Sequence, residues 1–199
     1  MKRLQLSIPP GALLIWSLLL FTLDRRESIA LLLAVSVHEL GHMAAMKAMG
    51  IELHTLGLEF CGLKMEYDGH ETLLKQAAAA AAGPAAGLIL ALLLSRFGGE
   101  RAALAAGLSL LLSLFNLIPV PPLDGGTLSL IILCALFGKE RGERLQQAIS
   151  ATCSIILIGV GLYFLLRGWG AGLLAAASAI AVYRLRAGKK AVNFHRAVI

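Results

Sequence analysis

Long apolar runs separated by short charged segments dominate this sequence. Each run approaches the ~20 residues that a helix needs to cross a bilayer core of ~30 Å. Six candidate spans follow, at residues 4–23, 28–50, 73–97, 101–118, 149–166 and 169–183. With 58% apolar and 15% charged residues and a mean hydropathy of +0.79, the chain is too hydrophobic for a soluble domain. We therefore predict an all-α polytopic membrane protein with about six transmembrane helices, forming a single membrane-embedded domain over residues 1–199.

The distribution of charge predicts the orientation of these spans. The first run has the outline of a signal peptide, but residues 22–26 offer no small-x-small cleavage site, so we expect a retained span. Lys and Arg cluster at both chain ends, including the tail 184–199, and at 139–147, which predicts cytoplasmic termini in a bacterial cell membrane. The net charge of +6 is explained by this anchoring, and no nucleic-acid partner is expected because the basic residues form no single stripe.

A short segment between the second and third runs has a different period. Apolar residues alternate there with polar residues or glycine, which is typical of a strand. The apolar positions are Cys61, Leu63, Met65 and Tyr67. Residues 51–60 are the expected partner strand, with a turn between Gly57 and Gly62, so we predict a small membrane-associated β-hairpin. It is either a plain connection or an edge on which an extended peptide docks.

One motif in the second run carries recognisable chemistry. His38 and His42 of the HELGH segment are four residues apart, so a helix presents both imidazoles on one face, where they can bind one metal ion. Glu39 then lies beside the metal and can take a proton from bound water. Ionisable residues within a transmembrane run cost ~2.5 kcal/mol or more each and by default mark a functional site.

A catalytic zinc ion needs at least one further protein ligand. A histidine six residues after His42 is excluded because position 48 is alanine. Glu59 and Glu66 are candidates, although Glu66 falls on the polar face of the expected strand. Asp124 is the best-placed candidate.

Asp124 lies in an interruption of the apolar pattern at residues 116–126. Three prolines remove backbone donors and disfavour helix, and two glycines permit conformations that other residues avoid. These are Pro119, Pro121, Pro122, Gly125 and Gly126. Irregular backbone at membrane depth is tolerated where it is buried in protein or lines a wet cavity, which favours a site here. An N-cap role for Asp124, on a helix beginning near Gly126, is the alternative. The following stretch, 127–138, either continues the broken fourth span or turns back.

The HELGH span followed by the NxxPxxPLDGG segment resembles the site-2 protease family of intramembrane zinc metalloproteases, the M50 type. The layout is most similar to the stage IV sporulation protease group. The resemblance implies that His38, His42 and Asp124 bind one Zn²⁺, that Glu39 is the catalytic acid and base, and that Asn116 contacts substrate.

The resemblance has two departures. Gly87 stands where many family members have asparagine. The C-terminal nucleotide-sensing domain of some relatives and the PDZ domain of others are expected to be absent.

The expected activity is hydrolysis of a peptide bond in or near a transmembrane segment of a membrane-anchored protein, such as a transcription-factor precursor, at a site open to the cytoplasm. Membrane regulatory proteins are further expected partners, and a role in sporulation fits the nearest group. The alternatives are an inactive relative that binds membrane partners and a membrane transporter that handles metal ions.

Overall fold

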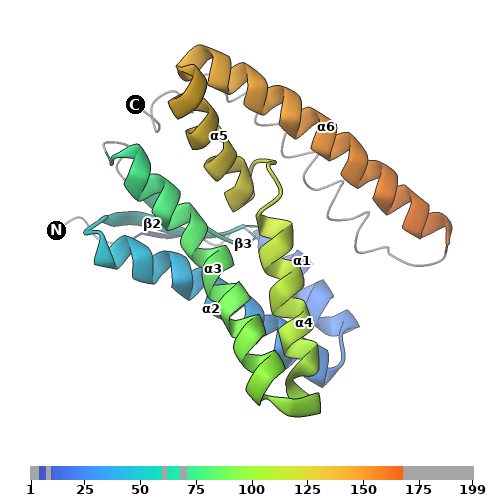
Figure 1. Cartoon of the computed structure of the whole chain (residues 1–199). Helices are drawn as coiled ribbons and strands as arrows, with labels where there is room; N and C mark the ends of the chain where they lie inside the picture. Colours follow the sequence, from blue (N-terminus) through green and yellow to red (C-terminus); the bar gives the residue numbers. More distant parts are fainter. Residues whose placement is uncertain (1–4, 8–9, 60–61, 68–70, 168–199) are drawn as a thin grey trace. The chain divides into compact units, whose positions relative to one another are not determined.

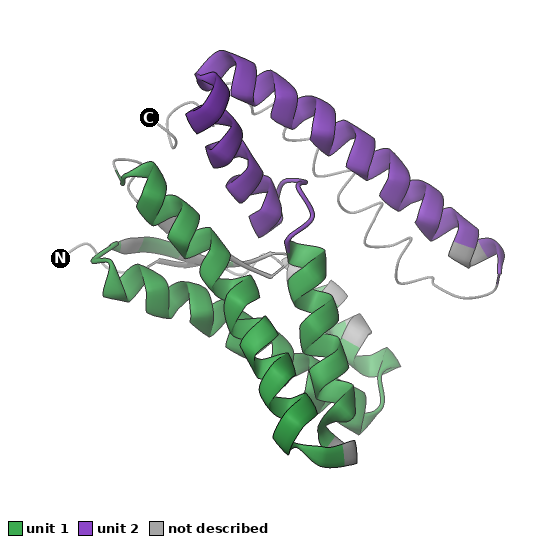
Figure 2. Ribbon diagram, in the orientation of Figure 1, with its two compact units in different colours: residues 1–116 green, residues 117–199 purple. Residues whose placement is uncertain are grey.

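The computed structural model describes residues 5–7, 10–59, 62–67 and 71–167. Helices predominate in these residues, and a small sheet lies among them (Figure 1). The helices are α1 Pro10–Thr22, α2 Arg25–Ala48, α3 Leu73–Phe97, α4 Gly99–Asn116, α5 Asp124–Phe137 and α6 Lys139–Leu166. The strands are β1 Gln5–Ser7, β2 Leu53–Glu59 and β3 Gly62–Tyr67. The chain divides into two compact units, Met1–Asn116 and Leu117–Ile199, which Figure 2 colours separately.

Helix α2 in the first unit starts at a capping box. The Asp24 carboxylate accepts from the Glu27 backbone N–H at 2.8 Å, and the Asp24 N–H donates to the Glu27 carboxylate at 3.0 Å. This reciprocal pair satisfies donors that the first turn would otherwise leave without partners. The cap fixes where α2 begins, and therefore which turn of the helix carries the HELGH segment.

Small residues allow the three long helices of the first unit to pack closely. Helices α2, α3 and α4 contact one another pairwise. A methyl group on Gly41 of α2 would lie 2.6 Å from the Ala82 carbonyl oxygen of α3, and one on Gly87 would meet the Ser113 hydroxyl of α4. Such approaches are possible where side chains are absent or small.

The sheet has the order β1-β2-β3. β2 pairs antiparallel with β3, with Leu56 opposite Met65, so strands form on both sides of the expected turn. Residues 60–61, where the turn falls, lie outside those described, and membrane association of the hairpin stays a prediction. β1 pairs in parallel with β2. The expected span 4–23 is therefore wrong at its start, because residues 5–7 are a strand and the helix begins at Pro10.

The second unit contains α5 and α6, which pack against each other. They are joined at Gly138, whose φ of 78° falls in the left-handed region that glycine adopts readily. Stretch 127–138 thus belongs to a separate helix, α5, which follows the non-helical residues 117–123. Helix α6 starts at Lys139, ahead of the apolar run expected from residue 149.

Three helices are long and apolar enough to cross a membrane among the described residues: Arg25–Ala48, Leu73–Phe97 and Lys139–Tyr163. The apolar part of α4, Ala102–Asn116, and helix α5 are shorter than a span. The chain is a membrane protein rich in helix, as predicted. Its expected sixth span, 169–183, and basic tail lie outside the described residues, so the total of six and the cytoplasmic termini stay predictions.

Candidate metal centre

His38 and His42 lie one turn apart on α2, and their side chains converge. Their Nε2 atoms are 3.2 Å apart, and their rings meet edge to face with centroids 4.9 Å apart. Both residues are buried, at 4% and 9% exposure. The four-residue spacing of His38 and His42 therefore places both imidazoles on one face of α2, as expected.

The separation of the two nitrogens matches what a tetrahedral metal requires. Two zinc–nitrogen bonds of 2.0–2.1 Å at the tetrahedral angle hold their nitrogens about 3.3 Å apart. The observed 3.2 Å between the Nε2 atoms is close to that value. Both Nε2 atoms can therefore reach one ion without a change of backbone.

The other nitrogen of His42 has a partner that fixes its proton. Nδ1 lies 2.7 Å from the Ala79 carbonyl oxygen of α3. A carbonyl oxygen can only accept, so Nδ1 carries the hydrogen, and in a neutral ring Nε2 keeps its lone pair. Metal-binding histidines commonly show this arrangement. No sequence pattern predicts this contact, because the acceptor is a backbone carbonyl, which every residue has.

Asp124 is the first residue of α5 in the second unit. Its carboxylate lies in the first helical turn, where the helix dipole favours negative charge. The expectation that it could cap a helix near Gly126 is wrong, because the N-cap is Leu123 and the helix already includes Asp124.

The two glycines after Asp124 are required because a side chain would not fit there, and not because the backbone needs a positive φ. Neither has a positive φ. A methyl group on Gly125 would lie 2.6 Å from the Ile118 carbonyl oxygen, and one on Gly126 would lie 2.5 Å from the Pro121 nitrogen. The start of α5 therefore packs directly on the backbone of the preceding proline-rich segment. Gln146 of α6 supports the same segment, since its Nε2 donates to the Pro119 carbonyl oxygen at 3.2 Å.

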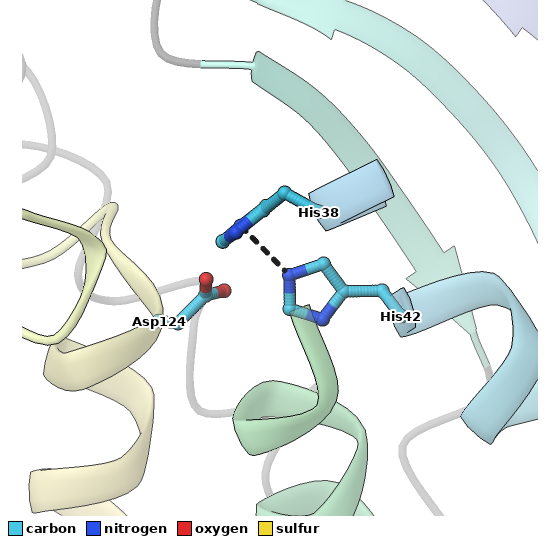
Figure 3. Close-up of side chains that lie close together, drawn as sticks. All are labelled: His38, His42 and Asp124. Carbon is cyan, nitrogen blue, oxygen red and sulfur yellow. Dashed lines mark hydrogen bonds between the residues drawn. The ribbon is translucent and has the colours of Figure 1, made fainter. Parts of the chain in front are cut away.

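The predicted ligands are His38 and His42 of the first unit and Asp124 of the second, and Figure 3 draws their side chains. Two nitrogens and one carboxylate oxygen are a donor set that suits zinc and leaves a fourth position for water. The donor chemistry of these residues thus fits Zn²⁺, as predicted. Glu59 and Glu66, the other candidate ligands, lie on β2 and β3 in stretches whose side chains are outside the described part.

Two further predicted residues lie outside this group. Glu39 is on α2 next to His38 and is buried at 8% exposure. Asn116 ends α4, and its side-chain amide donates to the Leu112 carbonyl oxygen at 3.0 Å. Their catalytic and substrate-binding roles stay predictions.

Comparisons with known proteins show what this chain is similar to. The model of the family described as Peptidase family M50 matches residues 100–160. "Putative zinc metalloprotease sll0528" from Synechocystis sp. is 35% identical over 145 residues, which are 66% of this chain and 38% of that protein. "Membrane metalloprotease ARASP, chloroplastic" from Arabidopsis thaliana is 33% identical over 118 residues, which are 56% of this chain and 26% of that protein. The chain spans less than two fifths of the length of either relative.

The fold is also similar to a solved structure. The site-2 protease from Methanocaldococcus jannaschii superposes with a TM-score of 0.67 and 21% identity, covering 90% of this chain and 88% of that one. At this identity the likeness shows a shared fold.

Helices of transmembrane length and a buried histidine pair with metal-binding geometry define a membrane metalloprotein. The family match and the metalloprotease relatives make the chain similar to peptidase family M50, the site-2 protease type. Its likeness to the sporulation group stays a prediction.

Proposed function

We propose that this chain is an intramembrane zinc metalloendopeptidase that hydrolyses a peptide bond in or near a transmembrane segment of a membrane-anchored protein. The histidine pair carries the proposal. Its two Nε2 atoms have the spacing that zinc requires, and they are buried on a helix of transmembrane length. The metalloprotease names of the relatives support the same activity.

The ligands in this proposal are His38, His42 and Asp124. Charge supports the set, because Zn²⁺ with ionised Asp124 and Glu39 and two neutral histidines sums to zero. Each carboxylate alone would be an uncompensated charge in an apolar setting, which costs several kcal/mol. The hydrogen bond from His42 to the Ala79 carbonyl selects, for the neutral ring, the tautomer whose Nε2 keeps its lone pair for a metal.

Glu39 is the proton carrier in the proposed mechanism. Bound zinc supplies a Lewis acid that polarises the scissile carbonyl and lowers the pKa of its water towards ~7. Glu39 accepts the proton from the attacking water and afterwards donates a proton to the leaving amine. Its burial beside His38 supports this role, because exclusion of bulk water strengthens the interaction of a carboxylate with the reacting groups.

The substrate must present an extended backbone, because a helix hides its carbonyl groups in internal hydrogen bonds. We propose that β3 holds it. β2 occupies one edge of β3, and the other edge has no strand neighbour among the described residues. An extended peptide can add to such an edge through backbone hydrogen bonds. Asn116 is the proposed side-chain contact to substrate.

The class of substrate and the side on which the site opens are assigned from the resemblance to the site-2 protease family. We propose a membrane-anchored transcription-factor precursor as the substrate and a site open to the cytoplasm.

A comparison of the parent with Glu39→Gln tests the activity. The purified proteins are assayed for zinc content and for cleavage of a single-span substrate in detergent or liposomes. The parent is expected to contain one zinc ion and to cleave, and the variant to keep zinc and lose cleavage. Normal turnover by the variant would refute the role of Glu39. Zinc without cleavage in both proteins would indicate an inactive relative that binds membrane partners. Zinc transport into liposomes would indicate a transporter.

A further inference from the structure

Gly83 of α3 lies directly against the ring of His42. A methyl group on Gly83 would lie 2.5 Å from Cε1 and 2.6 Å from Cδ2 of that ring, and closer still to Nε2. Figure 3 shows the ring beside the green ribbon of α3. Gly83 and His42 are both buried, and both belong to the first unit.

The opposite side of the ring is held by the same helix. Nδ1 donates to the Ala79 carbonyl oxygen, one turn before Gly83, at 2.7 Å. The ring therefore rests over Gly83 while its Nδ1 is tied to Ala79. These two contacts with α3 together set the direction in which Nε2 points.

An added methyl group at position 83 would move the metal-binding atom. Ordinary carbon contacts begin at about 3.4 Å, so the ring atoms would have to retreat by roughly 0.8 Å, and Nε2 by more. Metal–ligand distances tolerate deviations of about 0.2 Å. Rotation of the ring would relieve the overlap, but it would also break the hydrogen bond to Ala79.

We propose that Gly83 is a positioning residue of the metal centre, because its missing side chain lets α3 orient the imidazole of His42 for metal binding. The inference rests on the proposed function in taking His42 as a ligand. Gly83 itself touches neither metal nor substrate in this proposal. It acts through His42.

The test compares Gly83→Ala with two matched variants. Gly107→Ala changes another helical glycine of the first unit at a place where a methyl group meets nothing within 4 Å. Gly87→Ala lies one turn further along α3, and its methyl group meets Ser113 of α4 instead of a histidine. Zn²⁺ affinity is measured by competition with a chromophoric chelator, ligand geometry by the visible spectrum of Co²⁺-loaded protein, and stability by thermal unfolding.

Gly83→Ala is expected to weaken zinc binding by about 10–100-fold, the usual effect of disturbing a group that orients a ligand, and to alter the Co²⁺ spectrum. Gly107→Ala should match the parent in both. Gly87→Ala should lower the unfolding temperature and keep the parental spectrum. A zinc affinity for Gly83→Ala within twofold of Gly107→Ala would overturn the inference, whereas a parent that binds no zinc would refute the proposed function.

A double variant covers the case in which Gly83→Ala does not fold. The overlap is with the ring of His42, so Gly83→Ala in a His42→Ala background should fold and unfold at the temperature of His42→Ala alone. A double variant that still fails to fold would show that position 83 is restricted by something other than His42, and would overturn the inference.

Discussion

Replacing Gly125 with alanine tests how Asp124, the proposed third ligand, is held. The added methyl group would lie 2.6 Å from the Ile118 carbonyl oxygen and nearer still to the carbonyl of Leu117. Both obstacles are backbone, so no side-chain rotation removes them. Relief requires the start of α5 to move by roughly 0.8 Å or more to reach ordinary contact at 3.4 Å. Asp124 precedes Gly125, so its carboxylate would move with the helix.

Two energetic effects oppose each other in this variant. Alanine is a better helix former than glycine by about 1 kcal/mol. Forcing extra atoms into a packed site costs about 1–3 kcal/mol, and backbone obstacles place this case at the upper end. We therefore expect a net loss of about 1–2 kcal/mol in the free energy of unfolding, together with weaker zinc binding, because a displacement of this size exceeds the ~0.2 Å tolerance of metal–ligand distances.

Gly159→Ala is the matched control, since Gly159 lies in α6 of the same unit and a methyl group there meets nothing within 4 Å. Zinc content after purification, zinc affinity and denaturant unfolding in detergent are measured for both variants. The control should equal or exceed the parent in stability. If Gly125→Ala were as stable as Gly159→Ala and bound zinc equally well, the tight packing at the start of α5 would not be what positions Asp124.

Two other predictions concern contacts within each unit. Gly87→Asn, which introduces the residue of many family members, should destabilise the protein because Ser113 fills the space, and adding Ser113→Ala should recover part of the unfolding temperature. Gln146→Leu should lower the free energy of unfolding by about 1 kcal/mol, because it leaves the partly buried Pro119 carbonyl without its donor; unchanged denaturant unfolding would show that this bond contributes nothing.

The long helices and the histidine pair could be predicted because their signals are local. An apolar run of 25 residues predicts α3 at its observed bounds, Leu73–Phe97. The spacing of His38 and His42 fixes their shared face once the segment is helical. The first inference depends on the length of the apolar run and the second on the period of the helix.

The strand β1 could not be predicted, because its cause is distant in sequence. Gln5–Ser7 is three residues next to an apolar helical stretch, and it becomes a strand through pairing with Thr55 to Gly57 of β2. The start of α6 was missed for another reason. Its first turns are charged and exposed, with Arg144 near Glu140 at 3.5 Å, so hydropathy marks where the apolar run begins rather than where the helix does.

The proline and glycine pattern correctly predicted a break in the helix before Asp124 but assigned the glycines the wrong purpose. Composition cannot distinguish a glycine needed for a positive φ from one needed for space. Only the distance from Gly125 to neighbouring backbone separates the two. The same limit applies to Gly83, whose importance depends on which side chain of another helix faces it.

The parallel pairing of β1 with β2 has a consequence for membrane insertion. The two strands bracket α1 and α2 in the chain, yet they are hydrogen-bonded neighbours in one sheet. Two strands hydrogen-bonded in one sheet lie on the same side of a membrane, so whatever part of α1 and α2 enters the bilayer must bring the chain back to the side of β1. The end of α2 that follows the histidines is then held on that same side by the sheet.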